Sequence, residues 1–127
     1  MSTPQPPTLD LSFLLHAAER LPGDPQADDL GPLIAAVARV EARAMDTDVY
    51  GSPHLKAAAL LQTLVRLPCL EHSNAPFAWA SSEAYLALHG KTLDYLPKEA
   101  VELVREVTAG DLGVAQIARR LRTWTRG

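Results

Sequence analysis

One segment near the middle of the chain is apolar around most of its circumference when it is drawn as a helix. It follows Ser52-Pro53, an N-cap residue and a proline at the first helical position, and reads HLKAAALLQTLVRL up to residue 67. A surface helix needs one apolar stripe, whereas a helix that is apolar all round must be surrounded by other elements. The sequence therefore predicts a bundle with the helix of residues 53–67 at its centre.

Helical periodicity also marks the segments on either side of this central helix. The predicted helices cover about residues 10–21, 28–44, 53–67, 75–89 and 97–110, and a terminal one begins near 114. No segment alternates steadily between apolar and polar residues, so the expected fold class is all-α, with about six helices. Residues 45–51 lack a helical period and predict a short hairpin or an irregular loop.

Size and composition indicate one globular domain. The chain has 127 residues, of which 47% are hydrophobic, and we expect a single domain over residues 9–127 behind a proline-rich lead-in at 1–8. A net charge of −3 provides no bulk positive field for nucleic acid or an anionic membrane. Cys69 is a lone cysteine, and no apolar run approaches the length of a membrane span. The expectation is a soluble cytoplasmic protein.

The loop between the third and fourth predicted helices carries the most specific pattern. Residues 66–79 read RLPCLEHSNAPFAW and resemble, without a gap, the signature R-N-H-P-F-x-D-G-N-K-R-T-A-W of the Fic/Doc (Fido) family. The matching letters fall on Arg66, Asn74, Ala78 and Trp79. Segments similar to those of Doc proteins extend the resemblance over about residues 9–123. The resemblance implies a Fic/Doc-type helical bundle with a short flap.

The same alignment places unexpected residues at the catalytic positions of the family. Pro68 replaces the catalytic His, His72 the acidic metal ligand and Ser73 the glycine, while Ala75 and Pro76 occupy the two cationic positions. Proline cannot accept a proton and also lacks a backbone N–H. We therefore expect a degenerate site with no cofactor and no metal, in a pseudoenzyme or toxin–antitoxin component that acts by protein binding.

An enzymatic alternative stays open at this point. A divergent transferase could move an AMP or phosphoryl group from ATP with Mg²⁺ to a protein hydroxyl, using His72 and Asn74. Simpler interpretations stand beside it: Asn74 as the N-cap of the helix beginning at Ala75, His72 as a loop residue and Cys69 as a small half-buried hydrophobe. A DNA-binding function is suggested only by arginines near the C-terminus. Such a function needs a second helix that enters the DNA groove, and we expect none after the terminal helix.

The resemblance also implies a protein partner. Doc toxins pair with a small antitoxin whose disordered segment folds onto the toxin, and a flap in this family docks the target. By position, the flap of this chain corresponds to Asp46, Thr47, Asp48, Val49, Tyr50 and Gly51. A small antitoxin-like or regulatory protein that binds beside these residues is the expected partner.

Overall fold

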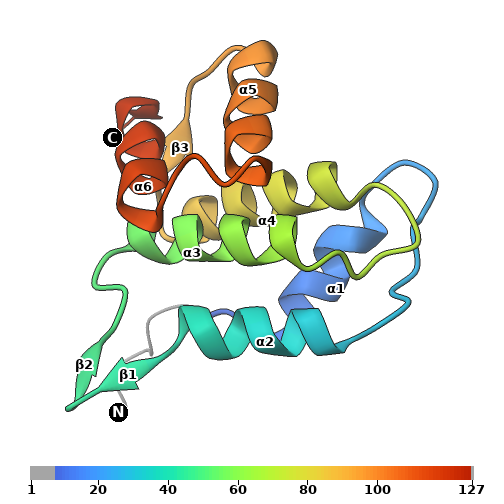
Figure 1. Ribbon diagram of the computed structural model, residues 1–127, viewed down its shortest axis with the longest axis horizontal. Helices are drawn as coiled ribbons and strands as arrows, with labels where there is room; N and C mark the ends of the chain where they lie inside the picture. The colour runs from blue at the N-terminus through green and yellow to red at the C-terminus, as the bar shows by residue number, and fades with distance from the viewer. Residues whose placement is uncertain (1–7, 127) are drawn as a thin grey trace.

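Helices dominate the computed structural model, which describes residues 8–126 (Figure 1). The elements in this range are α1 (Leu11–Glu19), α2 (Gly31–Val40), β1 (Arg43–Ala44), β2 (Thr47–Asp48), α3 (Pro53–Arg66), α4 (Asn74–Leu88), β3 (Thr92–Leu93), α5 (Pro97–Thr108), α6 (Val114–Thr123) and β4 (Thr125–Arg126). The predicted mostly helical fold with six helices is confirmed. The lead-in predicted for residues 1–8 lies, except for Thr8, outside the described residues.

The central position predicted for α3 is confirmed. This helix contacts α2, α4, α5 and α6, and residues 57–64 are buried without interruption. In Figure 1, α2 lies along one side of α3, and α5 and α6 stand on the other. Three consecutive alanines, residues 57–59, let the neighbouring helices approach closely because their side chains are short. The start of α3 follows the predicted signal, since the Ser52 hydroxyl accepts the N–H of Leu55 at 3.2 Å.

The helix predicted for residues 28–44 is shorter at both ends. At its start, the Asp29 carboxylate accepts the N–H of Gly31 at 2.9 Å, which keeps Asp29 in a turn before the helix. At its end, the Ala42 carbonyl accepts the N–H of Val49 at 2.9 Å, so the chain leaves the helix to form a hairpin. The prediction extended the helix too far at this end because Ala42 and Ala44 both favour a helix.

Two antiparallel strand pairs complete the fold. The β1–β2 hairpin pairs Arg43 with Asp48 and Ala44 with Thr47, and it projects beyond the end of α2 (Figure 1). Strand β4 returns the C-terminus to β3, supported by the Asp94 N–H on the Trp124 carbonyl at 2.7 Å. A short hairpin was one of the two structures predicted for residues 45–51. The β3–β4 pair was not predicted, because two-residue strands leave no detectable period.

His54 joins the first turn of α3 to the C-terminal strand. Its Nε2 lies 2.8 Å from Thr125 Oγ1, and because that hydroxyl donates to the Leu121 carbonyl, the imidazole must be the donor. Burial, with smaller contributions from the charges of Arg122 and Lys91, lowers the pKa of His54 below its ordinary value. The folded protein therefore favours the neutral ring.

This arrangement predicts a pH-dependent stability. The unfolded chain binds the His54 proton more readily, so the stabilisation is complete above about pH 6.5 and is lost as the pH falls toward the lowered pKa of the folded state. We expect the melting temperature to decrease between about pH 7.5 and 5.5, and His54→Gln to flatten that decrease. His72→Gln, at an exposed ring, is the control. An equal slope in the wild type and His54→Gln would contradict the assignment.

Candidate functional site

The loop that carries the signature-like residues is held against a second loop. Between α3 and α4, the Cys69 carbonyl accepts the N–H of Asp28 at 2.8 Å and that of Asp29 at 3.3 Å. The Glu71 N–H donates to the Gln26 carbonyl at 3.1 Å, and Ala27 forms a bridge with Leu70. Backbone pairing of this kind fixes the path of an otherwise irregular segment. The loop therefore has a defined frame, set by the connection between α1 and α2.

Asn74 fixes the same loop from the inside, and its predicted role as an N-cap is wrong. Asn74 is the first residue of α4, and its Oδ1 accepts the N–H groups of Cys69 at 3.0 Å and Leu70 at 2.9 Å. Its Nδ2 donates to the Leu70 carbonyl at 3.0 Å. The side chain points back into the loop because the N-cap position belongs to Ser73, whose φ of 65° is left-handed. Asn74 thus holds the loop rather than the helix end.

The residues at the positions that the alignment gives to the base and the metal ligand, Pro68 and His72, lie on the surface of the loop. Pro68 is exposed, and the exposed His72 ring has its Nδ1 2.8 Å from the Ser73 hydroxyl. A Cβ added to Gly23 would lie 3.2 Å from the His72 ring, so Gly23 leaves room for that ring while adopting a φ of 84°. The His72 Nε2 is 3.9 Å from Glu71 Oε1. These contacts describe a loop histidine with a hydroxyl neighbour.

No group of three His, Cys, Asp or Glu side chains within residues 8–126 could hold a metal ion. Cys69 is buried, more completely than the half-burial expected. Burial raises the pKa of its thiol, and the charge of Asp29 adds to the effect. The neutral thiol is therefore favoured, as expected for a small core residue and not for a nucleophile.

Ala75 and Pro76, at the positions where the family signature has cations, open into an apolar groove. They form one wall together with Trp79, and the groove encloses about 790 Å³ between α4 and α5. The remaining lining residues are Tyr95, Pro97, Ala100, Val101, Val104, Arg105, Thr108 and Ala109. Arg105 supplies the one cation in this lining, and its Nη2 lies 2.8 Å from Glu102 Oε2. The groove therefore offers apolar surface where a nucleotide site would offer cations.

Aromatic side chains stiffen one end of the groove. The Trp79 indole N–H donates to the Tyr95 hydroxyl at 3.0 Å, and the two rings meet edge to face with centroids 5.1 Å apart. Trp124 contacts both rings, with centroids 6.1 Å from Trp79 and 5.7 Å from Tyr95. Such pairs contribute about 0.5–1.5 kcal/mol each beyond area burial. Trp124 thereby ties the C-terminal part of the chain to this wall.

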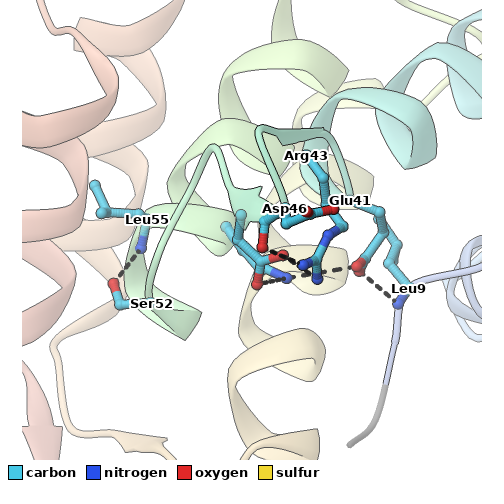
Figure 2. Close-up of polar contacts among 8 residues, drawn as sticks. Leu9, Glu41, Arg43, Asp46, Ser52 and Leu55 are labelled. Atoms are coloured by element: carbon cyan, nitrogen blue, oxygen red, sulfur yellow. Dashed lines mark hydrogen bonds and ion pairs between the residues drawn. The ribbon is translucent and has the colours of Figure 1, made fainter.

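The flap predicted over residues 46–51 is an ordered hairpin end. Met45 and Asp46 form its turn, with φ values of 52° and 63°. Asp48 forms an ion pair with Arg43, in which Arg43 Nη1 lies 3.2 Å from Asp48 Oδ1. Arg43 also donates to the Asp46 carbonyl, and Figure 2 shows the two residues facing each other. Tyr50 accepts a hydrogen bond of 2.9 Å from Arg39 Nε. The flap is therefore held by side chains from outside the predicted segment.

Three further residues support this segment and were not predicted from the sequence. Arg39 donates to Tyr50, and Lys56 Nζ lies 3.3 Å from Asp48 Oδ2 and 3.4 Å from Glu41 Oε2. Each lies on a helix or at its end, where charged residues are usually solvated, and no local pattern distinguished them.

The terminal arginines have partners elsewhere in the fold. Arg120 pairs with Glu106 at 3.1 Å, and Arg126 pairs with Asp94 at 2.6 Å. These arginines join α6 and β4 to the rest of the bundle.

Fold and site define a small helical protein with a braced loop, an apolar groove beside it and a short hairpin at the predicted flap. The chain is 38% identical over 101 residues to the protein named Toxin Doc of Mycolicibacterium smegmatis (strain ATCC 700084 / mc(2)155), and the match covers 78% of each chain. The chain therefore belongs to the Doc toxin family. No family model matches the chain. Within residues 8–126, no helix combines the length and apolar character needed to cross a bilayer.

Proposed function

We propose that this chain is a toxin–antitoxin component with a degenerate Fic/Doc site, and that it acts in the cytoplasm by binding protein. The observation that carries the proposal is the character of the surface at the start of α4. Where the family signature has two cations, Ala75 and Pro76 line an apolar groove of about 790 Å³. Apolar, aromatic-edged surface favours a protein segment over a polyanion.

Four features of residues 66–79 weigh against nucleotide transfer. Pro68 has no proton-accepting group, and Pro76 has no backbone N–H to offer a phosphate. The Phe77 N–H, which follows, donates to the Ser73 carbonyl at 2.9 Å. A charge-assisted contact typically contributes about 1.5–3 kcal/mol, so losing two cations weakens phosphate binding by at least about a hundredfold.

The enzymatic alternative depends on His72 and Asn74 acting together. Both lone pairs of Asn74 Oδ1 are occupied by the N–H groups of Cys69 and Leu70, so this oxygen would have to leave the loop to serve a substrate. His72 is paired with the neighbouring Ser73 hydroxyl. The arrangement thus supports a structural role for Asn74 more than a catalytic one.

We propose a small antitoxin-like protein as the partner. The α4–α5 groove provides the apolar contact that a folding-upon-binding segment needs, because such a segment must bury enough apolar surface to offset its ordering. The flap at residues 46–51 is a second docking surface, proposed from the family resemblance. It lies at a different end of the bundle from α5 (Figure 1), so a partner that reaches both surfaces has to wrap around the bundle.

Calorimetry tests the loss of nucleotide binding. Titration of ATP with Mg²⁺ into the purified protein is expected to show no binding at micromolar affinity, because the base and both cations are replaced. Titration of the same ATP and Mg²⁺ solution into buffer is the control for the heat of dilution, and titration of Mg²⁺ alone into the protein is the control for binding of the metal ion by itself. Micromolar binding with a stoichiometry near one would overturn the proposal and support the transferase alternative.

A further inference from the structure

The turn of the flap hairpin has a conformation that its residues do not favour. Met45 and Asp46 both have positive φ values, 52° and 63°, which are usual for Asn-Gly but not for methionine. The Met45 side chain is almost fully exposed, at 98%, so burial of this residue does not hold the turn. A turn of this kind persists when the surrounding structure determines it. The contacts at the base of the hairpin are therefore decisive.

Lys56 provides the central contact at this base. Its Nζ lies 3.4 Å from Glu41 Oε2 and 3.3 Å from Asp48 Oδ2, so one cation joins a carboxylate just before the hairpin to one in its second strand. The Lys56 side chain is only 15% exposed, which limits screening by water and salt. The second carboxylate oxygen of Glu41 accepts the N–H of the buried Leu9 at 3.0 Å, as Figure 2 shows. The bridge is thus anchored in α3 and in the N-terminal part of the chain.

A second cation supports the same segment from α2. Arg39 donates to the Tyr50 hydroxyl at 2.9 Å, to Thr63 Oγ1 at 2.9 Å and to Gln62 Oε1 at 2.8 Å. Thr63 and Gln62 are buried in α3, so Arg39 connects the end of the flap to the central helix of the bundle. Arg39 holds the end of the flap through Tyr50, whereas Lys56 contacts both Glu41, before the hairpin, and Asp48, in its second strand.

We propose that Lys56 is a positioning residue for the flap: its bridge between Glu41 and Asp48 holds the β1–β2 hairpin in one orientation on α3 and presents Met45 as a preformed contact. This inference depends on the proposed function, in which the flap docks a protein partner. A flap that is ordered in the free protein loses less conformational freedom on binding, which favours affinity and fast association. The kind of partner that fits is the proposed antitoxin-like protein, with apolar side chains that cover the exposed methionine when its segment folds onto the flap.

Amide hydrogen exchange of Val49 tests this positioning in the free protein. The Val49 N–H donates to the Ala42 carbonyl across the hairpin, so its exchange rate reports opening of the flap. Lys56→Met is expected to raise this rate by at least about tenfold while amides in the middle of α3 keep their rates. Lys56→Arg, which retains the cation, is expected to stay within about threefold of the wild type. Lys98→Met, at an exposed lysine of α5, is the matched control.

The outcomes separate this inference from the proposed function. If Val49 exchanges at the wild-type rate in Lys56→Met, the inference is overturned. If Lys56→Met accelerates every amide, Asp48→Asn replaces it, and unchanged Val49 exchange in that variant would equally overturn the inference. Binding of the protein encoded by the adjacent reading frame is measured in parallel, and Lys56→Met is expected to weaken it while Lys56→Arg restores it. Absence of binding by the wild type would refute the proposed function and leave the exchange result intact.

Discussion

Replacing Asn74 by alanine is expected to destabilise the fold by about 2–4 kcal/mol, which corresponds to a melting temperature lower by about 8–15 °C for a domain of this size. The substitution removes the acceptor for the N–H groups of Cys69 and Leu70 and the donor to the Leu70 carbonyl. Cys69 and Leu70 are buried, so water does not readily replace these bonds. Thermal and urea unfolding provide the measurement.

Asn74→Asp is the matched control for this effect. The carboxylate keeps the acceptor for both N–H groups, and its negative charge lies at the N-terminus of α4, where it is stabilising. The donor to the Leu70 carbonyl is lost and a carboxylate oxygen faces that carbonyl instead, a repulsion that the favourable charge at the helix N-terminus partly offsets, so we expect a net cost of about 1 kcal/mol. Replacing an ordinary N-cap residue by alanine would also lower the stability by about 1 kcal/mol. A loss of that size in Asn74→Ala would mean that the bonds to the loop contribute little.

Placing a charge in the α4–α5 groove is expected to weaken partner binding by at least about a hundredfold, the effect typical of a hot-spot residue. Val101→Asp makes this change at a side chain that is 62% exposed, so the fold itself should be preserved. The unpaired carboxylate would be desolvated against an apolar partner segment. Binding is measured by calorimetry against the protein encoded by the adjacent reading frame.

Ile34→Asp provides the comparison for Val101→Asp. Ile34 lies on α2 with a similar exposure of 56%, and it does not line the groove. Both variants add one carboxylate to an exposed aliphatic position, so a general effect of charge would appear in both. Equal affinities for the two variants would exclude the groove as the partner site, and hydrogen exchange of the complex would then locate the protected surface.

The helical segments were predictable because each buries a stripe or a full circumference of apolar residues, and that pattern is written into neighbouring positions. The central place of α3 followed from the same reasoning. The end of α2 was predicted less well, because Ala42 and Ala44 favour a helix by intrinsic propensity. There the cross-hairpin bond between Ala42 and Val49 decided the outcome.

The candidate site divides in the same way. The sequence alone identified the loop at residues 66–79 and the unusual residues Pro68, Ala75 and Pro76, since residue identity determines which groups are available for chemistry. It could not show that the Asn74 side chain turns back to Cys69 and Leu70. An asparagine at this position can form its side-chain hydrogen bonds either as an N-cap or within the loop.

By itself the sequence determined the helical class and the central helix, and through the resemblance to the Fic/Doc signature it predicts a site without a base and two cations. The tertiary structure alone decided where the apolar groove lies and what holds the flap. The groove forms between α4 and α5, and the flap bridge joins Lys56 to Glu41 and Asp48. Both features depend on how separate elements approach one another, and such distances are set by the packing of the whole core.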